Sequence, residues 1–254
     1  LVKLEKKITI ITPTFNSSKT ILSNLKSVKN QKFKNFEHLI IDNDSKDGTK
    51  KLVKKKINKK TRIISEKDNG IYDAINKGIK ISKGEIICIL HSDDIFYNNK
   101  VLSKVVKAFN ENKVDIVYGN LQYVSKNNLN KVIRFWKSSI YSKGKFSKGW
   151  SPPHPAFFIK RKIYKKFGLY KTKIGNPADI ELMYRLLEIK KVKNIYINKI
   201  LVKMRYGGKS NSSIKEIFKQ NIKTLDFLNI NNPLKIIKFL YFKLVDRSLQ
   251  FIKK

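Results

Sequence analysis

Three short apolar runs in this chain are each followed at once by a polar motif. The runs are Ile8-Thr-Ile-Ile11, Leu39-Ile-Ile41 and Glu85-Ile-Ile-Cys-Ile-Leu90. They are rich in isoleucine and nearly uncharged, which is typical of buried parallel strands. The motifs that follow them are Thr12-Pro-Thr-Phe-Asn16, Asp42-Asn-Asp-Ser-Lys-Asp-Gly48 and His91-Ser-Asp-Asp94. Because open α/β sheets bind ligands beyond the carboxyl ends of their strands, we expect these motifs to converge on one site.

Segments with helical spacing alternate with the apolar runs, and this alternation predicts an α/β fold with a mostly parallel sheet flanked by helices. A chain of 254 residues with 41% hydrophobic content is large enough to bury a core. The predicted helices cover residues 17–31, 70–83 and 95–109, and a fourth motif, Pro177-Ala-Asp-Ile-Glu181, opens another. Further strands are predicted at 62–65, 114–118, 156–159 and 194–202.

The C-terminal stretch alternates apolar and basic residues. From about Ser213 the apolar side chains recur at helical spacing, so we predict a basic amphipathic helical tail over residues 213–254. Such a helix suits an anionic membrane surface, and it equally suits packing on the rest of the domain.

The net charge of +37 comes almost entirely from lysine, with six arginines in the chain. Base-edge and bidentate phosphate recognition favours arginine, and the lysines are spread along the whole chain. We therefore interpret the charge as solvated faces rather than a nucleic-acid surface, with attraction to anionic membranes or phosphorylated substrates as a secondary effect.

Cys88 is the one cysteine of the sequence and lies inside an apolar run. This excludes a disulfide framework and a multi-cysteine metal site. The first seven residues lack the apolar core of a signal peptide. We expect a cytoplasmic protein, peripheral at the inner face of the membrane if the tail binds lipid.

Asp93 and Asp94 are adjacent carboxylates at the end of a predicted buried strand. The two carboxylates repel each other unless a cation or hydroxyl groups that donate hydrogen bonds lie beside them. Magnesium and manganese are typically held by one or two protein carboxylates together with phosphate oxygens, so the pair suits a metal that arrives with a diphosphate. The alternative is that Asp94 caps the helix that follows.

Taken together, the motifs resemble family 2 glycosyltransferases, inverting enzymes of the GT-A (Rossmann-like) fold that use nucleotide diphosphate sugars. The resemblance covers roughly residues 7–211. Besides the motifs above, it is carried by residues 65–78, by His154-Pro155, by Ala178-Asp-Ile-Glu181 and by Gly207-Gly-Lys-Ser210. It implies one GT-A domain over residues 1–212, with a nucleotide-sugar half at about 7–120 and an acceptor half at 121–212.

The resemblance also implies roles for individual residues. Asp94 would hold a divalent metal, Mn²⁺ or Mg²⁺, on the donor diphosphate, and Asp93 would hold the ribose. The other residues implied in donor binding are Thr12, Phe15, Asn16, Asp42, Asp68, Gly70 and Asp73. Arg205 and Lys209, near the glycine pair at 207–208, are predicted to neutralise donor phosphates. His154 lies between prolines and is assigned either to acceptor binding or to a packed turn.

Inverting sugar transfer needs a general base for the acceptor hydroxyl. The resemblance places Asp179 in that role, at the start of a helix where a carboxylate is favoured. Ala178 stands where the family often has glutamate, so Glu181 is the second candidate base. The alternative is that Asp179 only caps its helix.

We therefore predict a metal-dependent inverting glycosyltransferase that moves a sugar, hexosyl or N-acetylhexosaminyl, from a UDP-sugar to a glycan or lipid-linked acceptor in surface polysaccharide biosynthesis. One alternative is a non-catalytic basic protein that binds nucleic acid or a membrane surface on the same scaffold. A nucleotidyltransferase is disfavoured because residues 12–19 lack a glycine-rich phosphate loop.

Overall fold

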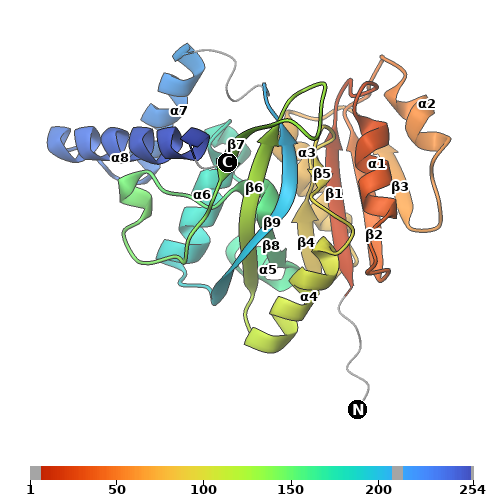
Figure 1. Cartoon of the computed structure of the whole chain (residues 1–254), viewed down its shortest axis with the longest axis horizontal. Helices are drawn as coiled ribbons and strands as arrows, with labels where there is room; N and C mark the ends of the chain where they lie inside the picture. Colours follow the sequence, from red (N-terminus) through yellow and green to blue (C-terminus); the bar gives the residue numbers. More distant parts are fainter. Residues whose placement is uncertain (1–6, 208–213, 253–254) are drawn as a thin grey trace.

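A mixed sheet forms the centre of the computed structural model, which describes residues 7–207 and 214–252 (Figure 1). Within these residues the sheet has nine strands in the order β3-β2-β1-β4-β8-β6-β9-β5, with β7 paired to β6. The strands are β1 Ile8–Thr14, β2 Phe36–Asp42, β3 Thr61–Ser65, β4 Ile86–Ile89, β5 Ile95–Phe96, β6 Ile116–Val124, β7 Val132–Trp136, β8 Phe157–Lys160 and β9 Asn194–Arg205. All but β5, β7 and β8 run in the same direction, so the mostly parallel α/β fold is confirmed.

Helices cover both faces of this sheet. They are α1 Ile21–Lys29, α2 Thr49–Lys54, α3 Ile71–Ile81, α4 Val101–Asn112, α5 Arg161–Phe167, α6 Ala178–Tyr184, α7 Ile214–Phe227 and α8 Pro233–Ile252. Alternate residues of a strand point to opposite faces. In β4, Cys88 packs with α4 on one face, whereas Ile87 and Ile89 pack with α3, α5 and α6 on the other. Both layers are therefore set by the period of two in the isoleucine-rich strands.

The first four strands of the parallel part bring the predicted motifs to one edge. β3, β2, β1 and β4 are neighbours and parallel, so the loops that follow them lie side by side at their carboxyl ends. The strand register pairs Thr14 with Asp42 and Asp42 with Ser65. Residues from three separate motifs thus share one level of the sheet.

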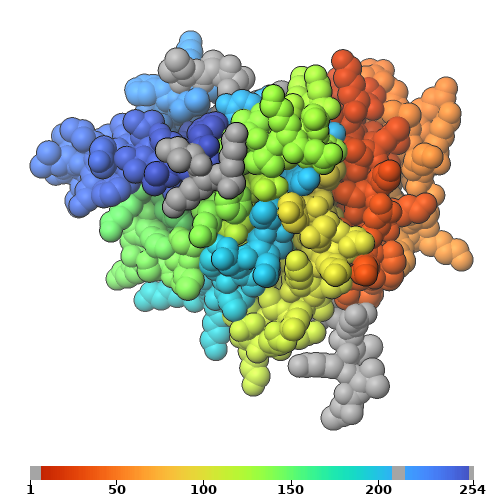
Figure 2. Space-filling model, viewed as in Figure 1, coloured from red at the N-terminus to blue at the C-terminus, as the bar shows by residue number. Residues whose placement is uncertain are grey.

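The C-terminal residues form two helices that lie at the opposite end of the molecule from α2 and β3 (Figures 1 and 2). α8 packs against β7 and against the 3₁₀ turn Phe146–Lys148. Among the described residues, none of the helices is long and apolar enough to cross a lipid bilayer.

Candidate functional site

Side-chain hydrogen bonds join the loops that follow β1, β2 and β3. The amide of Asn16 donates to Ser45 Oγ at 2.8 Å, and Asn16 Oδ1 accepts from the amide of Lys46 at 3.0 Å. Asn43 Oδ1 accepts from the amide of Asp68 at 2.9 Å. Asn16 has a positive φ of 45°, a conformation that asparagine tolerates better than most residues. These hydrogen bonds hold the three loops, which carry residues predicted to bind the nucleotide sugar, in one fixed arrangement.

Asp42 is fully buried at the end of β2 and accepts three hydrogen bonds. Ser45 donates to it through its amide (3.1 Å) and its hydroxyl (2.5 Å), and Ser65 donates through its hydroxyl (2.6 Å). Asp68, at the end of the next loop, accepts from the amide of Gly70 at 2.8 Å. Burial raises the pKa of Asp68, and this hydrogen bond opposes the rise.

The remaining predicted donor residues differ in exposure. Thr12 is buried, and its hydroxyl is 2.8 Å from His38 Nε2. Phe15 is 53% exposed, so its ring is open to solvent. Gly70 has φ +108° just before α3, a conformation that favours glycine. Asp73, in the first turn of that helix, accepts from the amide of Asn69 at 3.0 Å.

Arg205 ties the end of β9 to the turn that carries Asp93 and Asp94. Its guanidinium donates to Asp93 O at 2.5 Å and to Ser23 Oγ at 3.2 Å. From α1, Asn24 Nδ2 donates to His91 O (2.9 Å) and Asp94 O (3.1 Å). The acidic pair is thus fixed from both sides through its backbone. Lys209, the second predicted cation, lies outside the described residues.

The carboxyl group of Asp94 is completely buried, and neither of its oxygens has a hydrogen-bond partner. Burial raises its pKa well above the usual range, Asp93 raises it further, and Arg205 opposes the rise. A buried carboxylate without partners is strongly disfavoured, and a divalent cation would satisfy it. The described residues hold no cluster of three metal-ligating side chains. Asp94 therefore fits a metal whose other ligands come from elsewhere, such as phosphate oxygens.

His154 lies inside the protein, in a 3₁₀ turn before β8. Its Nε2 is 2.7 Å from the Tyr170 hydroxyl, and its ring centroid is 5.8 Å from that of His91. Burial lowers the pKa of His154 to about 3, so the ring is neutral. This packing matches the turn interpretation, and acceptor contact stays a prediction.

Asp179 begins α6 and is partly buried beside α3. Its Oδ1 accepts from the amide of Ile180 at 2.8 Å, and the neighbouring Tyr72 hydroxyl donates to Asn176 O at 2.7 Å. Burial raises the pKa of Asp179 to about 6, although hydrogen bonds from Ile180 and Tyr72 and the charge of Lys243 oppose the rise. A carboxylate with a pKa near 6 is suited to accept a proton at neutral pH.

Glu181 lies two residues after Asp179, on another side of α6 and in a different environment. Its carboxylate pairs with Lys171 Nζ at 2.8 Å and with Arg185 Nε at 3.0 Å, and the side chain is almost fully buried. Arg185 also donates to the carbonyls of Phe167 and Leu169. The carboxylate of Glu181 is already engaged by Lys171 and Arg185, whereas that of Asp179 is in no ion pair among the described residues, which favours Asp179 of the two candidates.

Further charged residues around Asp179 were not identified from sequence. Lys243 and Arg247 of α8 and Arg134 of β7 approach this region, and Tyr123 lies near enough to both Asp94 and Asp179 to sense their charges. The sequence alone gave little reason to single these residues out. Arg134 stands in a segment without periodicity, and the α8 residues stand among many lysines.

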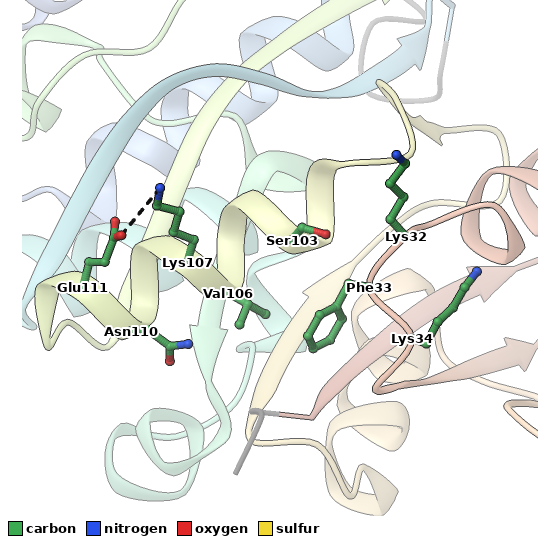
Figure 3. A pocket seen from close by; sticks show the side chains of 8 residues that line it. All are labelled: Lys32, Phe33, Lys34, Ser103, Val106, Lys107, Asn110 and Glu111. Carbon is green, nitrogen blue, oxygen red and sulfur yellow. Dashed lines mark ion pairs between the residues drawn. The ribbon is translucent and has the colours of Figure 1, made fainter. Parts of the chain in front are cut away.

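A cavity of about 640 Å³ lies away from these residues, between α4 and residues 32–34 (Figure 3). Three lysines line it, and one of them, Lys107, faces Glu111 at 3.7 Å. The 32–34 segment leads into the amino end of β2, whereas the motifs follow the carboxyl ends. This cavity is therefore separate from the candidate site.

Comparisons with known proteins show the family and the fold of this chain. Over 236 residues the chain is 27% identical to the UDP-Glc:alpha-D-GlcNAc-diphosphoundecaprenol beta-1,3-glucosyltransferase WfgD of Escherichia coli, covering 92% of this chain and 90% of that protein. The structure of Staphylococcus aureus TarS 1-349 in complex with UDP-GlcNAc superposes with a TM-score of 0.66 at 17% identity, covering 94% of this chain and 73% of that 1-349 chain.

A second structure with this fold is the mannosyltransferase PcManGT from Pyrobaculum calidifontis in complex with GDP-Man and Mn²⁺. It has a TM-score of 0.66 and 17% identity, covering 96% of this chain and 70% of that one. The sequence model of Glycosyl transferase family 2 matches residues 9–168, more than half of the chain. The chain therefore belongs to glycosyl transferase family 2 and is a glycosyltransferase of GT-A fold.

Proposed function

We propose that this glycosyltransferase moves a sugar, with inversion, from a UDP-sugar to a lipid-linked or glycan acceptor in the assembly of a surface polysaccharide or glycolipid. The observation that carries the proposal is the contrast between two acidic residues. Asp94 is buried with unpartnered oxygens, and Asp179 is a partly buried carboxylate with a pKa near 6. Different environments of this kind separate the roles of carboxylates in one active site. The names of the E. coli relative and of the TarS complex support the UDP-sugar donor.

In the proposed mechanism Asp179 removes the proton of the acceptor hydroxyl. The oxygen attacks the anomeric carbon of the donor sugar as the bond to the diphosphate breaks on the opposite face, and this inverts the configuration. The amide of Ile180 orients the Asp179 carboxylate, and the Tyr72 hydroxyl, which donates to Asn176 O, lies beside it. The attacking group must be positioned as well as deprotonated, and a fixed carboxylate at a helix start provides both.

Asp94 would hold the divalent metal, and Asp93 would bind the ribose. A bound cation of this kind neutralises charge that develops on the leaving diphosphate. Arg205, held at the same turn, adds a positive charge beside the acidic pair. The loops after β1, β2 and β3 would bind the nucleoside with Thr12, Phe15, Asn16, Asp42, Asp68, Gly70 and Asp73. This division makes residues 7–120 the donor half and 121–212 the acceptor half.

The proposal is tested by the pH dependence of transfer. With UDP-glucose or UDP-GlcNAc, Mn²⁺ and a prenyl diphosphate-linked sugar acceptor, we expect kcat/KM to fall about tenfold per pH unit below pH 6. The sign follows from the role: the base must be ionised, and its pKa of about 6 means that it becomes protonated as the pH drops through that value. Tyr72 and Lys243 face the carboxylate and both lower its pKa. Rates of UDP release with and without acceptor give the profile, and a flat profile from pH 5 to 8 would refute Asp179 as the base.

We also propose that α8 binds an anionic bilayer. Its outer stripe, defined as Leu234, Ile237, Tyr241 and Leu244, repeats at helical spacing, and each of these side chains is at least 61% exposed. A net charge of +37 opposes self-association through this stripe and favours a surface of negative charge. Figure 2 shows α8 at the edge of the molecule, where a flat surface can reach it.

Vesicle sedimentation tests this second part. Ile237→Glu with Leu244→Glu is expected to reduce binding to phosphatidylglycerol vesicles by about tenfold or more, since burying each such side chain contributes roughly 1.5–3 kcal/mol. Ile140→Glu is the matched control, because Ile140 is 73% exposed but lies outside α8. Equal losses in both variants, or equal binding to phosphatidylcholine, would contradict the proposal.

A further inference from the structure

The side of α8 that packs on the domain carries charged residues. Along the helix the more buried positions are Ile236, Phe239, Lys243, Arg247 and Gln250. Two of these five are cations, whereas the outer stripe is apolar. An ordinary amphipathic helix buries an apolar face, whereas α8 buries two cations together with Ile236 and Phe239. The inward cations therefore need an explanation other than packing.

Arg134 of β7 faces the same region. Its side chain is only 8% exposed, and its Nε is buried without a hydrogen-bond partner. The guanidinium carbon lies 4.4 Å from the ring centroid of Tyr123 and 5.6 Å from those of Trp136 and Phe251. Aromatic faces fix the plane of the guanidinium and partly offset its desolvation, but they leave its Nε–H without an acceptor.

Arg134, Arg247 and Lys243 together form what we call the α8 cation cluster. Burial lowers the pKa of Arg247, and the charge of Arg134 lowers it further. Burial also lowers the pKa of Lys243 to about 7, and the charge of Arg247 adds to this effect. The three groups are thus close enough to repel one another.

The chain supplies little negative charge to compensate this repulsion. Within residues 7–207 and 214–252, no carboxylate forms an ion pair with any member of the cluster. Asp246 stands next to Arg247 but accepts from Gln250 at 2.7 Å. Lys243 donates to the neutral side chain of Asn221 at 2.7 Å. Asp179 acts on Lys243 and Asp246 acts on Arg247, but neither carboxylate forms a direct ion pair with the cluster. Buried cations with so little counter-charge are costly, so this cluster suits an anion that is not part of the chain.

The α8 cation cluster lies beside Asp179. Lys243 is near enough to lower the pKa of that carboxylate, and the helix approaches closely because residue 149 is glycine: a Cβ there would come within 2.6 Å of Lys243 Cβ. Asp94 and Arg205 mark the donor diphosphate at the turn after β4, whereas the cluster lies between Asp179 and the outer stripe of α8.

We propose that the α8 cation cluster binds the phosphate group of a lipid phosphate or diphosphate acceptor. This inference rests on the proposed function and names its acceptor class. Guanidinium groups pair with phosphate oxygens in bidentate fashion, which suits Arg247 and Arg134, whose Nε has no hydrogen-bond partner. A lipid tail would then lie toward the apolar outer stripe and the sugar hydroxyl toward Asp179.

Calorimetric titration with two probes tests this assignment. Farnesyl diphosphate represents the acceptor phosphate, and UDP with Mn²⁺ represents the donor. Arg247→Gln and Lys243→Gln are expected to weaken farnesyl diphosphate binding by about tenfold or more, the loss of a charged hydrogen bond, and to leave UDP binding unchanged. Arg62→Gln, an exposed arginine on β3, removes the same charge at the far end of the sheet and is expected to change neither.

Three results would overturn the inference. The first is that the wild-type protein does not bind farnesyl diphosphate. The second is that Arg247→Gln and Arg62→Gln bind farnesyl diphosphate with equal affinity, and the third is that the cluster variants lose UDP binding instead. Arg134→Gln is a further variant, and if it does not fold, the two α8 variants decide the matter. Failure of wild-type UDP binding would count against the proposed function itself, so the two failures are distinguishable.

Discussion

Replacing Asp179 by asparagine is expected to lower kcat for sugar transfer by about 10²- to 10⁴-fold, the usual contribution of a general base. The amide keeps the size of the side chain and can still accept from Ile180, but it cannot take the acceptor proton. UDP affinity should stay unchanged because the donor residues lie on other loops. The measurement is the initial rate of product formation at saturating donor, together with calorimetric binding of UDP.

Stability separates a catalytic role from a structural one at this position. Folding raises the pKa of Asp179, which means that its ionised form is less stable in the folded chain than in the unfolded chain. At pH 8, where the group is ionised, Asp179 therefore lowers the free energy of unfolding. The Asp179→Asn variant has a neutral side chain here and is therefore expected to melt at or above the wild-type temperature. Asp226→Asn, at an exposed position on α7, is the matched control. A rate that survives Asp179→Asn but is lost in Glu181→Gln would transfer the role of base to Glu181.

Asp94→Asn is expected to abolish the Mn²⁺ dependence of UDP binding and to lower turnover roughly a thousandfold or more, because a cation at the leaving group contributes several kcal/mol. An amide lacks the charge that a divalent cation requires. The measurements are calorimetric binding of UDP with and without Mn²⁺ and the turnover rate at saturating Mn²⁺.

The fold should survive this second substitution. Both oxygens of Asp94 are buried without partners, so removing its charge relieves a destabilising contact. Such trade-offs between stability and activity are common at functional sites. Asp115→Asn, which loses ion pairs with Lys160 and Lys162 instead, should lower the melting temperature and serves as the contrasting variant. Unchanged Mn²⁺ dependence in Asp94→Asn would show that Asp94 is not a metal ligand.

The first half of the fold could be predicted from sequence because its signals are local. Isoleucine-rich runs marked β1, β2 and β4, and the register of parallel strands then aligned the motifs after them without further information. The predicted tail likewise appears as two helices. In each case the pattern of a single segment contains the whole signal.

The second half was less accessible because its contacts join distant segments. β7 was not predicted, since it does not stand out from its surroundings in composition. In the first half, the helix predicted over 95–109 was wrong at its start, because Ile95–Phe96 pairs with the distant β9 as β5 and α4 begins only at Val101. Arg134 gains its meaning only when Tyr123, Trp136 and Phe251 surround it, and these come from two strands and the last helix. Likewise, the ion pairs of Glu181 with Lys171 and Arg185 favour our proposal of Asp179 over Glu181, a choice that the motif alone leaves open.

The arrangement of α8, with an apolar outer stripe and two cations on the packed side, also bears on how the enzyme can be engineered. A designer seeking a more soluble protein would delete this helix or replace its apolar side chains with charged ones. Deletion would also remove Lys243 and Arg247. From the role proposed for these cations, we expect a truncated enzyme to keep its donor pocket, lose its grip on the acceptor phosphate and consume nucleotide sugar by hydrolysis. Solubility is better sought at the outer stripe alone, where Leu234 and Ile237 can be changed without disturbing the inward cations.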